Sequence, residues 1–400
     1  MAKNAKSYDI LIAGAGIFGV TAAVELAKRN HRVALVNPDT VPHHLAASAD
    51  ISKAVRMEYG SDLEYFRMAE ISIRGWLEWN DFFDTELYHQ VGFLMLCKEH
   101  ITSERQSFEQ ASHHSLLTAG YTPEIIEREL LKKRFPAVNP QTYAQACYNS
   151  VGGYAESSKA IEHLISYATT LGVEIHLGQT VDQLIVQNHQ LTGIKTKEGS
   201  LFNCGHAHIA AGAHTPWLVP GLGAYFKATG HPVFWLRPKE PELFKPSNFV
   251  VFTADIANSG WYGFPFNENH GVVKVARHSN GQELHPEKDD RRVTDKETRA
   301  LRSFLKNSLP ELAEAPLVYT RKCLYTDTLD GHYWIDKHPE IKGLSVGTGG
   351  CGHGLKMGPI LGELQADMIE EKSNPFNKRF RWRHLTMETA DKEQARHMEG

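Results

Sequence analysis

Three glycines near the N-terminus have the spacing of a turn that holds a dinucleotide. Gly14, Gly16 and Gly19 lie in the run GAGIFG, between an apolar stretch over 8–13 and a helical pattern over 20–27. The first glycine permits a tight turn, the second lets the backbone approach a pyrophosphate, and the third lets helix and strand pack closely. The helix N-terminus then stabilises the phosphate charge. The motif predicts a dinucleotide site in a βαβ unit.

The second strand of this unit, over 32–36, ends without the acidic residue that usually binds ribose hydroxyls. The sequence there is Val36-Asn37-Pro38-Asp39. Asn37 offers a neutral hydrogen-bond partner for the ribose, and Asp39 is the nearest carboxylate. Either residue can serve the ribose in this prediction.

Two kinds of pattern follow, and together they predict a mixed α/β fold. Helical patterns over 62–84 and 157–170 and apolar strand patterns over 201–212 and 344–350 continue a Rossmann-like domain. Between about 232 and 278 the chain instead alternates apolar and polar residues, as in a half-buried antiparallel sheet. We expect a Rossmann-like dinucleotide-binding domain assembled from separate segments, with an antiparallel-sheet domain inserted.

Composition excludes several classes of protein. The formal net charge is −4, with both signs mixed along the chain, so no extended basic field for nucleic acid is expected. No apolar run is long enough to cross a membrane, and the start lacks a signal-peptide pattern. The five cysteines form no CxxC pair, so neither a disulfide framework nor a zinc site is indicated. We expect a cytoplasmic protein, with a peroxisomal location left open.

A family resemblance extends over nearly the whole chain. Its most specific segments are KCLYTDTLDGHYWIDKHP over 322–339 and GGCGHGLK over 349–356, supported by ADISKAVRMEYG over 49–60 and GVVKVARH over 271–278. These resemble the monomeric sarcosine oxidase family of amine-oxidising flavoproteins, which includes N-methyltryptophan oxidase and fructosyl amino acid oxidases. The resemblance implies FAD as the cofactor, a small amino-acid-like substrate, O2 as the electron acceptor and a monomeric protein.

Two residues acquire roles at the flavin from this resemblance. Cys323 matches the cysteine that forms a thioether with the flavin ring, and the basic neighbours Arg321 and Lys322 would favour its thiolate. Lys274 matches the lysine beside flavin N5 that is associated with oxygen activation, where a fixed cation stabilises developing negative charge. Both residues taken alone would read as structural, a buried thiol and a strand lysine.

The substrate side is expected to be formed by two cations. Arg56 and Lys356 match the pair that binds the substrate carboxylate, and an arginine fork fits a carboxylate with two parallel hydrogen bonds. Tyr262 and His278 match positions that line the substrate side of the flavin, and Tyr325 follows Cys323 by two residues. No residue has the features of an obligatory general base.

The residues around Lys53 do not decide between two classes of substrate. The segment Asp50-Ile51-Ser52-Lys53 resembles fructosyl amino acid oxidases, whereas the following residues 56–60 resemble sarcosine oxidases. The further residues that the resemblance places at the cofactor are Ile17, Phe18, Ser48, Ser52, Val181, Gly212, Gly349, Gly352, His353, Gly354 and Leu355, in addition to the glycines, Asn37, Lys53, Cys323 and Lys356 named above.

Three histidines raise the alternative of a metal site. His206 and His208 would share one face of a strand, and His214 follows soon after. Because no third ligand has suitable spacing, we expect no metal.

The predicted function is oxidation of a secondary amine of an amino acid, either sarcosine or another N-substituted or cyclic amino acid, by FAD. The alternatives are a fructosyl amino acid oxidase, a dehydrogenase that passes electrons to a carrier, and a flavin-binding protein without amine turnover. The expected division assigns 1–90, 150–230 and 320–385 to FAD binding, 91–149 and 231–319 to the substrate domain, and 386–400 to a flexible tail.

Overall fold

The computed structural model describes residues 7–102, 107–386 and 395–396. It contains two large mixed sheets and one small sheet. Most of the tail expected over 386–400 lies outside these residues, but Ala395 is buried and Arg396 forms an ion pair of 2.8 Å with Asp327. These two residues of the expected tail thus pack against the rest of the chain.

The first large sheet has eight strands, and its centre is the parallel set β9, β2, β1, β12 and β20. Strands β10 and β11 add an antiparallel extension beside β12, and β19 pairs with β20. The strands are β1 (Ser7–Ala13), β2 (Val33–Asn37), β9 (Glu174–Leu177), β10 (Val181–Gln187), β11 (Gln190–Thr196), β12 (Leu201–Ile209), β19 (Trp334–Lys337) and β20 (Leu344–Thr348).

The second large sheet has nine strands and is largely antiparallel, as the alternating pattern predicted. Its longest strands pair with each other and carry the site residues Cys323 and Tyr325. The strands are β5 (Phe93–Cys97), β6 (Glu124–Glu127), β7 (Gln145–Asn149), β13 (Phe226–Leu236), β14 (Val251–Ala254), β15 (Trp261–Gly263), β16 (Val273–Arg277), β17 (Gln282–Glu283) and β18 (Leu317–Thr328).

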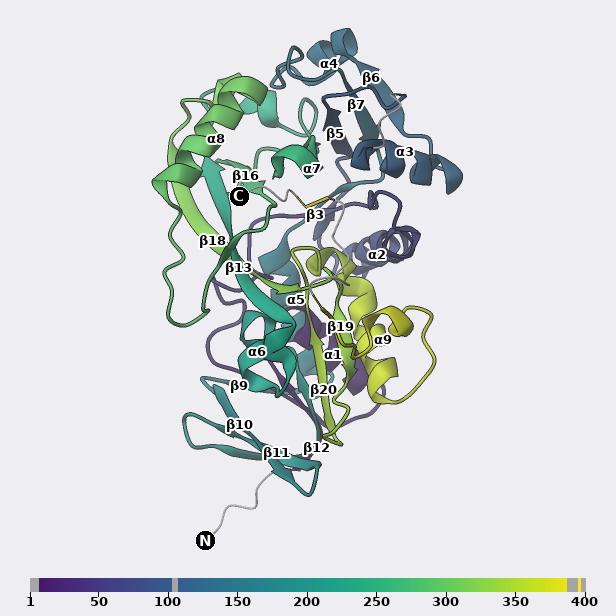
Figure 1. The fold of residues 1–400 in the computed structure, drawn as a ribbon, viewed down its shortest axis with the longest axis vertical. Helices are drawn as coiled ribbons and strands as arrows, with labels where there is room; N and C mark the ends of the chain where they lie inside the picture. Colours follow the sequence, from purple (N-terminus) through teal and green to yellow (C-terminus); the bar gives the residue numbers. More distant parts are fainter. Residues whose placement is uncertain (1–6, 103–106, 387–394, 397–400) are drawn as a thin grey trace.

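A small antiparallel sheet joins segments that are distant in the chain. Its strands are β3 (Lys53–Val55), β4 (Tyr88–His89) and β8 (Gly153–Ala155). In Figure 1 β10 to β12 lie in the lower half of the molecule and β5 to β7 in the upper half, with β13 and β18 extending between them. The small strand β3 lies near the middle, so Lys53 is placed where the two halves meet.

The helices are held by local signals and by close packing. Asp62 caps α2 by accepting from the Tyr65 amide at 3.1 Å, and Thr294 with Glu297 forms a capping box at α8. Gly362 of α9 lies so close to α1 that a Cβ there would be 2.6 Å from the Thr21 carbonyl oxygen. The described α-helices are α1 (Ile17–Lys28), α2 (Leu63–Phe82), α3 (Phe108–Thr118), α4 (Arg128–Arg134), α5 (Ser157–Thr170), α6 (Thr215–Leu218), α7 (Ile256–Ser259), α8 (Asp295–Ser308) and α9 (Gly358–Ile369).

One hydrophobic core lies under the parallel sheet, where α1, α2, α5 and α9 pack, and another fills the antiparallel half around β5, β13, β14 and α8. Strand β18 pairs with β13 in the second sheet, although most of it falls in the 320–385 segment that the sequence assigned to FAD binding. No helix within the described ranges is long and apolar enough to cross a membrane.

Candidate active site

The glycine turn after β1 forms one end of a large cavity of about 780 Å³. This volume is typical of cofactor sites, which span about 300 to 1,000 Å³. Gly14 has a φ of +106°, and a Cβ at Gly19 would be 1.8 Å from the Gly14 carbonyl oxygen. Both glycines are therefore required by the turn itself. Gly16 has an ordinary backbone conformation and lines the cavity, which leaves its bare backbone open to a ligand.

Two polar side chains hold this turn in shape. The Ser48 hydroxyl accepts a hydrogen bond from the Ile17 backbone amide at 3.0 Å, and the side-chain Oδ1 atom of Asn37 accepts one from the Ala15 backbone amide at 3.1 Å. The side-chain Nδ2 atom of Asn37 also donates to the Asp39 backbone carbonyl oxygen at 2.9 Å. Asn37 thus stabilises the loop and also lines the cavity. The rest of the lining has mixed charge, with the cations Lys197, Lys288 and Arg291 and the carboxylates Asp39, Asp182 and Glu287.

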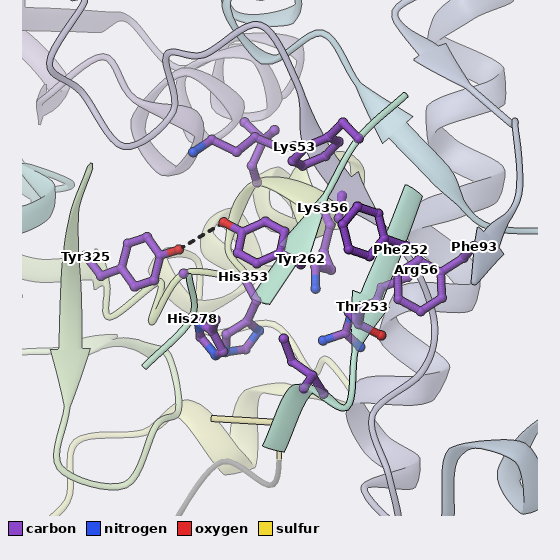
Figure 2. Close-up of a pocket in the computed structure, with 15 residues that line it drawn as sticks. Lys53, Arg56, Phe93, Phe252, Thr253, Tyr262, His278, Tyr325, His353 and Lys356 are labelled. Carbon is purple, nitrogen blue, oxygen red and sulfur yellow. Dashed lines mark hydrogen bonds between the residues drawn. The ribbon is translucent and has the colours of Figure 1, made fainter. Parts of the chain in front are cut away.

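A smaller cavity of about 70 Å³ adjoins the large one. The two share the lining residues Lys53, Tyr325, Gly352 and Leu355. Figure 2 shows the cationic side chains of Arg56 and Lys356 in the smaller cavity, with Phe93 and Phe252 on one side and Tyr262 and Tyr325 on the other. The remaining lining residues are Ala54, Thr253, Ile256, Phe264, His278 and His353.

Arg56 is more than nine-tenths buried, yet its Nη1 atom has no hydrogen-bond partner among the described residues. Its guanidinium carbon lies 5.2 Å from the centre of the Tyr59 ring, and Lys356 Nζ lies 5.0 Å from the same ring. Buried charged groups are normally paired, because leaving them unpaired is costly. The Nη1 atom of Arg56 can therefore donate to an anion bound in this cavity, beside the ammonium of Lys356. The buried carboxylate of Glu58 also attracts both cations.

The two tyrosines of the smaller cavity face each other. The hydroxyl oxygens of Tyr262 and Tyr325 are 3.5 Å apart (Figure 2). Burial raises the pKa of Tyr262 and raises that of Tyr325 well above its usual value. Both phenols are consequently protonated at neutral pH and can donate hydrogen bonds. Gly352 has a φ of +81°, and a Cβ there would be 2.3 Å from the Tyr325 ring, so only glycine permits this contact.

Lys274 and Cys323 lie in the wall behind the cavities, since neither lines them. Lys274 Nζ is 2.7 Å from the carboxylate of Asp50 and 4.5 Å from the centre of the Phe264 ring. Cys323 is almost fully buried, and its Sγ is 3.8 Å from Lys53 Nζ. Burial lowers the pKa of Lys274 to about 8, against the opposing attraction of Asp50.

Most of the residues predicted at the cofactor line one of the two cavities. These are Gly14, Gly16, Ile17, Phe18, Asn37, Ser48, Lys53, Val181, Gly212, Gly352, His353, Gly354, Leu355 and Lys356. Gly19, Ser52 and Gly349 do not line them. Gly19 packs against the turn, Ser52 accepts a hydrogen bond from Lys274 through its carbonyl oxygen, and Gly349 has a φ of +74° close to Thr328.

Two buried carboxylates were missed from the sequence. Asp50 has a side chain that is 1% exposed, and Glu58, fully buried, accepts from Asn149 Nδ2 at 2.9 Å. Burial raises the pKa of Glu58. A spacing signal was present for Asp50, which precedes Lys53 by three residues, but an aspartate near a lysine usually marks a surface pair.

The histidines considered for a metal are dispersed by the fold. His206 Nε2 and His208 Nδ1 both contact the Ser345 hydroxyl, at 2.7 and 2.8 Å, whereas His214 lines the large cavity. Within the part of the chain that the structure describes, no group of three or more histidine, cysteine or acidic side chains could hold a metal ion.

Comparison with known proteins identifies the family. The model of the DAO family, described as FAD dependent oxidoreductase, matches residues 9–368. The chain is 28% identical to L-saccharopine oxidase of Schizosaccharomyces pombe, over 94% of this chain and 93% of the relative. It is also 28% identical to human peroxisomal sarcosine oxidase, over 91% of this chain and 92% of the relative.

Among solved structures, fructosyl peptide oxidase from E. terrenum superimposes with a TM-score of 0.83 at 22% identity, covering 99% of this chain and 96% of that chain. This likeness shows the shared mixed α/β fold. The glycine turn and the volume of the large cavity fit FAD. The chain belongs to the DAO family of FAD-dependent oxidoreductases.

Proposed function

We propose that this flavoenzyme oxidises the secondary amine of an amino acid, with O2 as the electron acceptor and H2O2 as a product. The observation that carries the proposal is the pair Arg56 and Lys356 in a small cavity beside the cofactor cavity, where the buried Nη1 atom of Arg56 has no hydrogen-bond partner among the described residues. A carboxylate is the anion that an arginine fork and a lysine fit best. The curated relatives named above, a saccharopine oxidase and a sarcosine oxidase, support an N-substituted amino acid as substrate.

The side chains in the small cavity act mainly by orientation. Arg56 and Lys356 would anchor the substrate carboxylate at one end, while Phe252 and Phe264 exclude water from the reacting carbon. Tyr262 and Tyr325 stay protonated and donate hydrogen bonds, so neither removes a proton from the substrate. His278 lines the same cavity and lies beside Tyr325, with ring centres 6.0 Å apart, which places it among the groups that position the substrate.

Bound FAD would accept a hydride equivalent from the carbon next to the substrate nitrogen, the resulting imine would be hydrolysed by water, and the two electrons would pass to O2. Lys274 supplies a buried cation in the wall of the site, where charge stabilisation is strong because water is excluded. Its proposed role is to stabilise negative charge on oxygen during that second step.

We further propose that FAD is attached through Cys323. The support is the contact of 3.8 Å between Lys53 Nζ and Cys323 Sγ, because Lys53 lines both cavities and so holds the sulfur beside the site. Acid precipitation of the purified protein should leave the yellow colour in the pellet, and Cys323→Ala should release it into the supernatant. Colour in the wild-type supernatant would contradict covalent attachment.

The substrate class is tested by a panel with peroxide detection. Sarcosine, N-methyl-L-tryptophan, L-proline, L-saccharopine and a fructosyl amino acid would be compared at equal concentration, with the corresponding primary amino acids as controls. We expect peroxide from at least one N-substituted amino acid and none from the primary amino acids. Peroxide from primary amino acids alone would contradict the proposal.

A fructosyl amino acid oxidase is the second candidate. Lys53 lines both cavities, and its segment resembles those enzymes, whose solved structures share the fold. Turnover of the fructosyl substrate alone would select this candidate. Slow reaction of the reduced flavin with O2 would instead indicate a dehydrogenase, and a flavin that no amine reduces would indicate a binding protein without turnover.

We also propose a monomer in the cytoplasm, with a peroxisomal location as the alternative because one human relative is named a peroxisomal enzyme. The proposed division into domains keeps 1–90 and 150–230 with the cofactor and 91–149 and 231–319 with the substrate. Only strand β18 in the segment 320–385 lies in the sheet of the substrate domain.

A further inference from the structure

Asp50 is a buried carboxylate surrounded by cations from three separate parts of the chain. Its Oδ2 atom is 2.7 Å from Lys274 Nζ on β16, 3.5 Å from Lys53 Nζ on β3 and 3.5 Å from Arg321 Nη2 on β18. The side chain of Asp50 is 1% exposed, and those of Lys274 and Arg321 are 2% and 6% exposed. One negative charge therefore balances three positive charges in the wall of the site.

The surroundings of this cluster contain few other charges. Lys53 Nζ also contacts Cys323 Sγ, and Tyr262 lies close enough to influence Lys53. Lys274 additionally donates to the Ser52 carbonyl oxygen and lies over the Phe264 ring. Arg321 donates to the carbonyl oxygens of His44 and Ala49, which fixes it in the wall. Asp50 is thus the carboxylate to which all three cations are bound.

The three cations respond differently to loss of Asp50. Arginine stays protonated at any pH that the fold survives. Lys53 keeps Cys323 as a second partner. Among the described residues, the contacts of Lys274 besides Asp50 are the carbonyl oxygen of Ser52 and the face of Phe264. A buried ammonium without a counter-ion releases its proton to solvent. Lys274 is therefore the group whose charge depends on Asp50.

We propose that Asp50 is a positioning residue for Lys274, whose ammonium it holds in the protonated, paired state beside Lys53 at the wall of both cavities. The charge of this wall then switches with the protonation of Lys274. Burial alone would raise the pKa of Asp50, but Lys274, Lys53 and Arg321 hold it well below its usual range, so the carboxylate itself stays ionised. The switch is consequently expected near the lowered pKa of Lys274, about 8.

The affinity of the oxidised holoenzyme for sulfite reports the charge of this wall, and its measurement needs no substrate turnover. A positive charge near the flavin favours the added anion, so affinity should fall as Lys274 loses its proton. The part of the pH dependence that comes from sulfite itself is the same in every variant. Dividing each sulfite affinity by that of Lys274→Met at the same pH removes this part. The test rests on FAD binding and not on the proposed amine substrate, so it distinguishes failure of this inference from failure of the proposed function.

We expect the wild-type affinity, relative to Lys274→Met, to show an inflection near pH 8. Asp50→Asn should move that inflection down by about one pH unit or more, because a carboxylate at 2.7 Å is replaced by a neutral amide. The matched control is Asp327→Asn, which removes a different buried carboxylate, one that lies on β18 with Arg321 and pairs with Arg396. The control should leave the inflection in place.

A second variant tests the inference if Asp50→Asn does not fold. Lys53→Met removes a like charge from the neighbourhood of Lys274 and should move the inflection to higher pH. An unchanged inflection in Asp50→Asn, or a downward shift in Lys53→Met, would overturn the proposal. A loss of flavin from Asp50→Asn with no shift in the remaining holoenzyme would reduce Asp50 to a structural role.

Discussion

Single residues determine what the small cavity can bind. The two cations that flank the Tyr59 ring come from the position after β3 and from the turn before α9, about three hundred positions apart in the sequence. Arg56 supplies a planar fork and Lys356 a point charge. Because the guanidinium Nη1 has no partner among the described residues, it contributes to binding only when an anion is present.

Replacing either cation should weaken substrate binding more than it slows the chemical step. Arg56→Gln and Lys356→Gln are each expected to raise KM for a carboxylate substrate about 10- to 100-fold, since a charge-assisted hydrogen bond contributes about 1.5–3 kcal/mol. Steady-state kinetics would measure this. Arg32→Gln, which removes an exposed arginine paired with Asp9, is the control and should leave KM unchanged. An unchanged KM in both cavity variants would reject the anchor.

The resemblance in the sequence selected several residues that line the small cavity, but not its phenylalanines Phe93, Phe252 and Phe264. It also did not select the buried carboxylates of Asp50 and Glu58. Arg56, Tyr262, His278 and Lys356 all line the cavity as expected. Asp50 was not selected because its importance comes from burial by β16 and β18, more than two hundred positions later. Local sequence does not distinguish a buried aspartate from one on the surface.

At the scale of elements, the turn between β1 and α1 separates the needs of the fold from those of the cofactor. A Cβ at Gly19 would overlap the Gly14 carbonyl oxygen at 1.8 Å, whereas a Cβ at Gly16 would meet only the Ser48 hydroxyl at 3.2 Å. The same motif therefore contains one glycine for packing and one for ligand access.

Alanine substitutions should separate these two roles. Gly19→Ala is expected to lower the melting temperature of the protein, because the strand and helix can no longer pack. Gly16→Ala should keep a melting temperature near that of the wild-type apoprotein and reduce the ratio of flavin to protein. Thermal unfolding and absorbance would measure both quantities. Full flavin content in Gly16→Ala would show that the cofactor backbone contact is not at this glycine.

The strands β12 and β20 are joined by a buried histidine network that should make stability depend on pH. Burial lowers the pKa of His206 to about 3 and of His208 to about 4, so both are neutral in the folded protein. In the unfolded chain they take up protons below about pH 6.5. The free energy of unfolding is therefore greatest above pH 6.5 and falls as the pH decreases toward 4, by up to about 1.4 kcal/mol per pH unit for each histidine.

Urea titrations between pH 7.5 and 4.5 would measure this slope. His208→Gln, which keeps a hydrogen-bonding side chain next to Gln365, should reduce the slope by up to about 1.4 kcal/mol per pH unit. A slope that does not change in this variant would show that His208 is protonated in the folded state. The sequence placed these histidines on one strand face, and the structure explains their burial by Ser345 of β20.

The sequence patterns located most elements, because their hydrophobic periods are clear. The expected strand over 8–13 is β1 (Ser7–Ala13), and the expected helix over 157–170 is α5 (Ser157–Thr170). The membership of β18 could not be foreseen, since a strand pattern does not state which sheet it joins. The pairing of β18 with β13 depends on contacts about ninety positions apart.

On the scale of the whole molecule, the site exists only because distant segments converge. The glycine turn comes from the first thirty residues, the cavity wall from β14, β15 and β18, and the Lys356 turn from the last fifty. Arg396, near the end of the chain, also reaches this region and donates to the Cys351 carbonyl oxygen at 3.0 Å. A fold of interleaved segments places the large and the small cavity side by side, and the proposed transfer between two bound molecules requires such an arrangement.

The central claim is that an N-substituted amino acid reduces the flavin of this protein and that O2 then reoxidises it. The most direct measurement mixes the holoenzyme with each substrate of the panel without oxygen, follows the visible absorbance of the flavin, and then admits O2 while peroxide is counted. We expect at least one N-substituted amino acid to bleach the flavin, with one H2O2 formed per flavin on reoxidation. A flavin that no member of the panel bleaches, in protein that dithionite still reduces, would contradict the claim.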